Sequence, residues 1–150
     1  MTVELGPVIR AARDTNDPTP IVEAIPYARF LGISAREERE GALLTTLAFS
    51  EGNIGNPALP AIHGGVVGAF LENTAILQLL WALESVHVPK TITITVDYLR
   101  TAGPAETYAR ATVTKLGSRV ANVRAFAWQA DEAKPVAGAN ANFLVTPADE

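Results

Sequence analysis

The longest apolar stretch of the chain runs from His63 to Leu83, HGGVVGAFLENTAILQLLWAL, and it contains no proline. Its alanines and leucines favour helix. Apolar side chains cover nearly the whole circumference of such a helix, which predicts that it is buried on all sides. Glu72 is the ionisable residue in its interior, and the residues one turn away from it are apolar. An ionised carboxylate there is costly unless it is paired or faces a wet cleft.

Two shorter helices are expected before this one. Residues 4–14 have an amphipathic pattern, and the turn-forming residues at 14–20 end it. The second helix is predicted from Pro20 to Gly32, because proline suits the first turn of a helix and glycine suits its end.

From Ile33 onward, the period of the apolar positions changes to two. This alternation predicts a weak strand at 33–39 and a better one at 42–49, with a turn at Gly41 between them. Residues 51–62 have the composition of a loop. Four further strands are predicted after the long helix, at 91–100, 107–115, 120–130 and 136–146.

Two of these strands have one face of small side chains, which would let the long helix approach the sheet closely, although alanine is frequent throughout the chain. The two faces comprise Ala121, Val123, Ala125 and Ala127, and Ala137, Ala139, Ala141 and Phe143. Short connections favour antiparallel pairing. One long helix against a mostly antiparallel sheet is an α+β architecture.

Composition narrows the class of protein. A chain of 150 residues predicts a single domain, 1–150, and a net charge of −4 argues against nucleic acid or an anionic membrane as a partner. Disulfides and thiolate chemistry are excluded because the chain has no cysteine. The N-terminal residues lack the pattern of a signal peptide, and polar residues interrupt the long helix, so a cytoplasmic protein without a membrane span is expected.

Together these features resemble a known family. The element order resembles the hotdog fold, in which a curved antiparallel sheet of about five to six strands wraps around a long helix. His63-Gly64-Gly65, with an acid nine residues after the histidine, resembles the signature of PaaI-type acyl-CoA thioesterases. PYARFLGI at 26–33 and VDYLRTAG at 96–103 are also similar. The resemblance covers about residues 20–146, which leaves 1–19 as a helical extension.

The resemblance implies roles for individual residues. Gly64 matches the glycine whose backbone N–H polarises the thioester carbonyl, and Glu72 matches the catalytic carboxylate. Ile76 departs from the pattern, because some members with a glutamate carry a threonine one turn after the acid. The alternative for Glu72 is a structural acid that is paired with an arginine or caps a partner helix.

The loop before the long helix holds two more candidates. Asn56 resembles the loop residue that places the nucleophilic water or the carbonyl, although the loop to His63 is slightly longer than usual. Asn53 is the alternative, and the Asn-Pro pair favours Asn56. His63 either orients the loop, binds the substrate carbonyl or caps the helix. Gly65 is expected at the substrate, unless the two glycines serve only tight packing.

Elementary chemistry supports the same two residues independently. The N–H of Gly64 is an unpaired donor at a helix start, where the helix dipole favours a developing oxyanion. Glu72 can act as a general base on water or attack the carbonyl itself. The eight residues between them correspond to roughly 12 Å along one helix, which is too far for both to act on one carbonyl. We therefore expect an obligate homodimer with a composite active site; whether two such dimers assemble further, as a dimer of dimers, is left open.

Binding of coenzyme A requires basic groups for its phosphates, and four residues at strand ends or turns are candidates: Lys90, Arg100, Lys115 and Arg119. No metal site is expected, because the chain has two histidines and no suitably spaced acids. No cofactor is expected apart from coenzyme A as part of the substrate. Phe70, Trp81, Tyr98 and Leu99 either shape an acyl pocket or belong to the core.

The leading hypothesis is an acyl-CoA thioesterase that releases a carboxylic acid and CoA. A non-catalytic domain that binds or senses acyl-CoA is an alternative from another class. A hotdog-type dehydratase or hydratase is disfavoured, because those enzymes resemble this fold but place a histidine about 14 residues before the acid, where this chain has Ala58.

Overall fold

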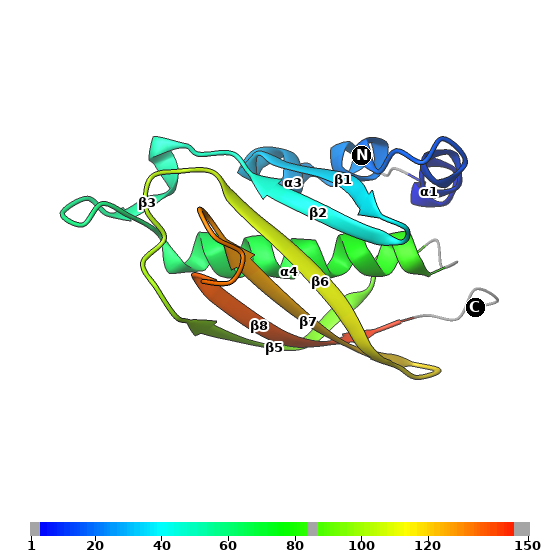
Figure 1. Cartoon of the computed structure of the whole chain (residues 1–150). Coiled ribbons are helices and arrows are strands. Elements are labelled where there is room, and N and C mark those ends of the chain that lie inside the picture. Colours follow the sequence, from blue (N-terminus) through cyan, green and yellow to red (C-terminus); the bar gives the residue numbers. More distant parts are fainter. Residues whose placement is uncertain (1–3, 84–86, 146–150) are drawn as a thin grey trace.

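A computed structural model describes residues 4–83 and 87–145. Figure 1 shows a curved sheet around the long green helix α4 (Gly64–Ala82), with the shorter helices beside β1. All strand pairs are antiparallel, in the order β1-β2-β6-β7-β8-β5. The strands are β1 (Ile33–Arg39), β2 (Ala42–Leu47), β5 (Lys90–Tyr98), β6 (Thr107–Leu116), β7 (Val120–Trp128) and β8 (Ala137–Leu144). The expected α+β hotdog architecture is confirmed.

Helix α4 is the centre of the core. Its side chains Phe70, Leu71 and Leu79 have no exposed surface, and they pack with the small inward faces of β7 and β8. The predicted role of those faces is therefore confirmed. By length and composition α4 could cross a membrane, but 61% of the relevant window is buried inside the protein, as in the core helix of a soluble-type domain.

The N-terminal helices differ from the expectation in one respect. The first helix is present as α1 (Leu5–Asp14), but the second is divided into α2 (Thr19–Ala24) and α3 (Pro26–Leu31). The break lies at Ile25, whose backbone is extended at φ −99° and ψ 106°. Proline disfavours helical geometry in the residue before it, so Pro26 ends one helix and begins the next. Gly32 ends α3 in the left-handed conformation, as expected.

The segment before α4 is more ordered than a loop. It contains a single 3-10 turn, η1 (Glu51–Asn53), and a small hairpin of β3 (Ile54–Asn56) and β4 (Ala61–Ile62). The hairpin leads directly into the start of α4. Its strands are too short for a period of two to be recognised in the sequence.

Buried polar side chains fix α4 against β2. Thr45 and Thr74 share a hydrogen bond of 2.8 Å, and Thr45 also donates to the carbonyl oxygen of Ala109. Gln78 accepts from the N–H of Leu43 and donates to the carbonyl oxygen of Gly41. These bonds set the rotation of the helix about its axis, and therefore decide which residues face away from the sheet.

Candidate active site

The first turn of α4 leaves one backbone donor free. The N–H of Gly65 donates to His63 Nδ1 at 2.8 Å, and those of Val66 and Val67 donate to the carbonyl oxygen of His63 at 3.0 and 3.2 Å. Within residues 4–83 and 87–145, the N–H of Gly64 has no acceptor. The four N–H groups that lack regular i→i−4 partners at this helix start belong to His63, Gly64, Gly65 and Val66. Three of them are satisfied, since that of His63 donates to the carbonyl oxygen of Asn53, and that of Gly64 remains available to a ligand.

His63 caps this helix, which is one of the three roles that the sequence left open. Because Nδ1 accepts a hydrogen bond, the neutral ring carries its proton on Nε2. The backbone N–H of His63 donates to the carbonyl oxygen of Asn53 at 2.8 Å. Gly55 passes so close that a Cβ atom on it would lie 2.7 Å from the Cα of His63. The segment of η1 and β3 therefore packs directly against the backbone of His63 and fixes its position.

The two candidate asparagines have different positions in this segment. Asn53 holds the start of α4 through its backbone oxygen. Asn56 is exposed at the end of β3, where its Oδ1 accepts from the N–H of Ala58 at 3.0 Å and shapes the turn. The Nδ2 group of Asn56 forms no hydrogen bond with any described residue.

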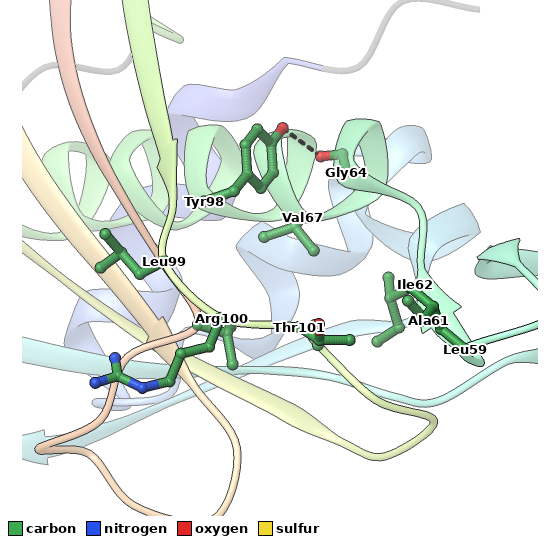
Figure 2. A pocket seen from close by; sticks show the side chains of 11 residues that line it. Leu59, Ala61, Ile62, Gly64, Val67, Tyr98, Leu99, Arg100 and Thr101 are labelled. Atoms are coloured by element: carbon green, nitrogen blue, oxygen red, sulfur yellow. Dashed lines mark hydrogen bonds between the residues drawn. The ribbon is translucent and has the colours of Figure 1, made fainter.

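A hollow of about 460 Å³ lies beside Gly64 (Figure 2). Its lining comes from the hairpin, the start of α4 and the segment after β5: Leu59, Ala61, Ile62, Gly64, Val67, Tyr98, Leu99, Arg100, Thr101, Ala102 and Val136. Most of these side chains are apolar. Two hydrogen bonds connect the walls of the hollow. The Tyr98 hydroxyl donates to the carbonyl oxygen of Gly64 at 2.7 Å, and the backbone N–H of Ile62 donates to the carbonyl oxygen of Ala102 at 2.8 Å.

Arg100 is the charged residue of this lining. Its side chain is exposed, and NH1 donates to the carbonyl oxygen of Pro135 at 2.8 Å. The backbone N–H groups of Leu99 and Arg100 both donate to the carbonyl oxygen of Val136. Arg100 thus keeps its positive charge next to the hollow on a well-anchored segment.

Glu72 is half-buried and does not line this hollow. It lies on a stripe of α4 that the sheet leaves partly open, together with Gly65, Gly68, Ala69 and Ile76, which are spaced by three or four residues. Within the described ranges, its carboxylate has neither an ion pair nor a side-chain hydrogen bond. The alternative of a pairing with an arginine therefore finds no support among those residues.

The other basic candidates lie at the opposite end of the sheet. Lys90 and Val120 both pair with Leu144, so Lys90 is two strands away from the turn that carries Lys115 and Arg119. Lys115 and Arg119 line a separate hollow of about 430 Å³. Lys90 itself is about 27 Å along β5 from Tyr98. One chain therefore does not bring these three groups together with Arg100.

The four candidates for an acyl pocket also lie in two different places. Phe70 and Trp81 are buried in the core, where Trp81 donates to Glu37 at 2.6 Å, whereas Tyr98 and Leu99 line the hollow. The sequence alone does not predict the contact of Tyr98 with Gly64. Tyr98 is two residues after Val96 on β5, so both side chains lie on the same face of the strand, and this is the signal that Tyr98 points toward the helix. No group of three acidic or histidine side chains placed to hold a metal occurs in the described part of the chain.

Comparisons with known proteins agree with this architecture. Residues 59–136 match the family model of the thioesterase superfamily. A Chromobacterium violaceum protein superposes with a TM-score of 0.75 at 40% identity, covering 92% of this chain and 96% of that one. A Ralstonia eutropha protein related to phenylacetic acid degradation superposes with a TM-score of 0.74 at 23% identity, covering 92% of this chain and 99% of that one. A Staphylococcus aureus thioesterase superposes with a TM-score of 0.71 at 12% identity, covering 82% of this chain and 100% of that one.

The last two similarities, at low identity, show the fold alone. None of the curated proteins matches the chain. The family model, however, spans more than half of the sequence and includes the hairpin end, the whole of α4 and the strands that line the hollow. The chain therefore belongs to the thioesterase superfamily.

Proposed function

We propose that this protein is a PaaI-type thioesterase that hydrolyses acyl-CoA to a carboxylic acid and CoA. Membership of the superfamily supports thioester hydrolysis in general. The observation that carries the finer proposal is the free N–H of Gly64 at the start of a 19-residue helix, beside a hollow with apolar walls. A thioester carbonyl that accepts this N–H is polarised by the donor and by the helix dipole.

In the proposed reaction, Glu72 removes a proton from water, and the water oxygen attacks the thioester carbon. Negative charge moves to the carbonyl oxygen, where the N–H of Gly64 stabilises it. When the C–S bond breaks, the sulfur leaves as thiolate and takes up the proton that Glu72 had removed from water. In the alternative route, Glu72 attacks the carbonyl carbon first and the CoA thiolate leaves, and water then hydrolyses the resulting anhydride, which restores the Glu72 carboxylate. The open stripe of α4 lets substrate and water reach the carboxylate.

Both routes require a second copy of the chain. Gly64 and Glu72 are separated by roughly 12 Å along α4, and Glu72 lies outside the hollow. A twofold axis near Gly68, midway between them on the same open stripe, would oppose Gly64 of one subunit to Glu72 of the partner subunit. Strand β5 ends the described sheet and has no neighbour on its outer edge. Antiparallel pairing of two such edges would create this dimer.

The same pairing would unite the scattered basic residues. Because β5 would run antiparallel to its copy, the Lys90 end of one subunit would lie beside the Tyr98 end of the other. Arg100 of one chain would then face the region of Lys90, Lys115 and Arg119 in the other chain. The phosphates of coenzyme A need such charge-assisted contacts. In this arrangement, Gly65 and the Nε2–H of His63 border the thioester, and Nδ2 of Asn56 orients the water or the carbonyl.

The test is thiol release from a panel of acyl-CoA substrates. Glu72→Gln is expected to lower kcat by about 10²-fold or more, because it removes the base or nucleophile. Gly64→Pro removes the donor, and the backbone tolerates it, since proline is favoured at the first helical position and His63 already has the extended backbone that proline requires (ψ 132°). The added Cβ would lie 3.3 Å from the Tyr98 ring, and alanine at this position adds the same contact. A loss of about 10²- to 10³-fold is expected. Gly64→Ala, which keeps the N–H, is the matched control.

Mixing the two inactive variants tests the composite site. In a dimer of one Glu72→Gln chain and one Gly64→Pro chain, one site retains both functional groups. Random reassociation should therefore restore about a quarter of the wild-type activity. A mixture that stays inactive would refute the shared site. Tight acyl-CoA binding by a wild-type protein that never releases thiol would replace the thioesterase with a binding or sensing domain.

A further inference from the structure

We propose that Tyr98 is a positioning residue that holds the first peptide of α4 so that the N–H of Gly64 points into the hollow. This inference rests on the proposed role of Gly64. The contact that carries it is the 2.7 Å hydrogen bond from the Tyr98 hydroxyl to the carbonyl oxygen of Gly64, across 34 residues of sequence.

The start of α4 needs an external restraint. Three of its first five residues, Gly64, Gly65 and Gly68, are glycines, which are the weakest helix formers after proline. Rotation about the backbone of Gly64 is not limited by a side chain. Without further contacts, the first turn would exchange between conformations, and the free N–H would lose its direction.

Two side chains form hydrogen bonds with opposite ends of one peptide group. The carbonyl of Gly64 and the N–H of Gly65 belong to the same planar unit. Tyr98 donates to its oxygen, and His63 Nδ1 accepts from its N–H at 2.8 Å. The preceding residue is held by Asn53. With both flanking units fixed, little freedom is left to the peptide that carries the N–H of Gly64.

The ring of Tyr98 also fits this position closely. A Cβ atom on Gly64 would lie 3.3 Å from the ring, and one on Gly68 would lie 3.5 Å from the hydroxyl oxygen. The ring therefore covers the first turn of α4, as Figure 2 shows. Tyr98 is nevertheless 58% exposed and lines the hollow. Its hydroxyl thus acts on the catalytic turn, whereas burial of the ring contributes little to the core of one chain.

The kinetic test uses Tyr98→Phe in the full-length protein, which removes the hydroxyl and keeps the ring. The variant should lower kcat about five- to tenfold, which corresponds to one lost hydrogen bond, with KM nearly unchanged, because the N–H of Gly64 acts most strongly in the transition state. The urea midpoint should change little. Tyr108→Phe is the matched control, since among the described residues the Tyr108 hydroxyl donates to Glu106 alone, at 3.0 Å, away from the hollow.

A second readout does not depend on activity. Selective ¹⁵N labelling of glycine yields spectra with signals from 11 residues, and Gly64→Ala identifies the signal of Gly64. Tyr98→Phe should shift the Gly64 and Gly65 signals and speed hydrogen exchange at Gly64, whereas Tyr108→Phe should not. Unmoved Gly64 and Gly65 signals, or an unchanged kcat in an active enzyme, would overturn the proposal. If the wild type hydrolyses no acyl-CoA, the proposed function fails and the spectra still test Tyr98.

Discussion

Replacing Gly55 with alanine should displace His63 and the start of α4, although Gly55 itself does not line the hollow. Gly55 lies in the hairpin strand β3, and an added Cβ would stand 2.7 Å from the Cα and 2.8 Å from the Cβ of His63. Glycine in a strand often marks such a close approach of another backbone. The obstacle is the main chain at the start of α4, so rotation of a side chain cannot relieve the clash.

The size of the effect follows from these distances. Ordinary contact begins near 3.4 Å, so the two segments must separate by at least about 0.7 Å, the difference between 3.4 and 2.7 Å. Overpacking of this kind costs about 1–3 kcal/mol of stability. A displacement near 1 Å at a catalytic group can cost about 10²-fold in rate. Because His63 caps α4 and precedes Gly64, we expect a ten- to hundredfold fall in kcat/KM.

Two measurements check this expectation. Urea denaturation gives the free energy of unfolding, and thiol release from an acyl-CoA gives kcat/KM. Gly52→Ala is the matched control, because the nearest atom to its added Cβ would be Ser50 Oγ at 3.7 Å, an ordinary contact. The control should stay within about 0.5 kcal/mol of wild type. If Gly55→Ala proves as stable and as active as Gly52→Ala, the hairpin does not position His63.

Two further predictions concern stability. Thr45→Val keeps the volume but removes the fully buried bonds to Thr74 and Ala109, so urea denaturation should show a loss of about 1–3 kcal/mol, and an unchanged midpoint would contradict this. The hydrogen bond from Arg110 holds the pKa of Glu38 below its usual 4.5. This pair therefore stabilises the fold above about pH 4.5 and ceases to do so as the pH falls through the folded-state pKa. The difference in urea midpoint between wild type and Glu38→Gln should accordingly shrink from about pH 7 to about pH 3. A difference that stays constant over this range would refute the stabilising role of the pair.

Local patterns in the sequence were enough for α1, α4, the six strands of the main sheet and the fold class, but not for the short hairpin of β3 and β4. The apolar run of α4 and the alternating strands each depend on neighbours a few residues away, and such periodicities survive in any tertiary context. The glycine and the acid of α4 could also be singled out, because an apolar helix makes both residues unusual. The break at Ile25 was missed, because the helical pattern continues on both sides of it, although the proline that follows is a signal for such a break.

Contacts between distant segments decided the rest. At the start of α4, the peptide after Gly64 is held by a hydrogen bond from Gly65 to the His63 ring and by Tyr98, which arrives from β5. That Arg100 and Lys90 lie at opposite ends of the sheet depends on the length of one strand. Strand β5 pairs with β8, the last strand in sequence, and not with β6, which follows it. Pairing and register arise from packing across the whole core, which no short window of sequence contains.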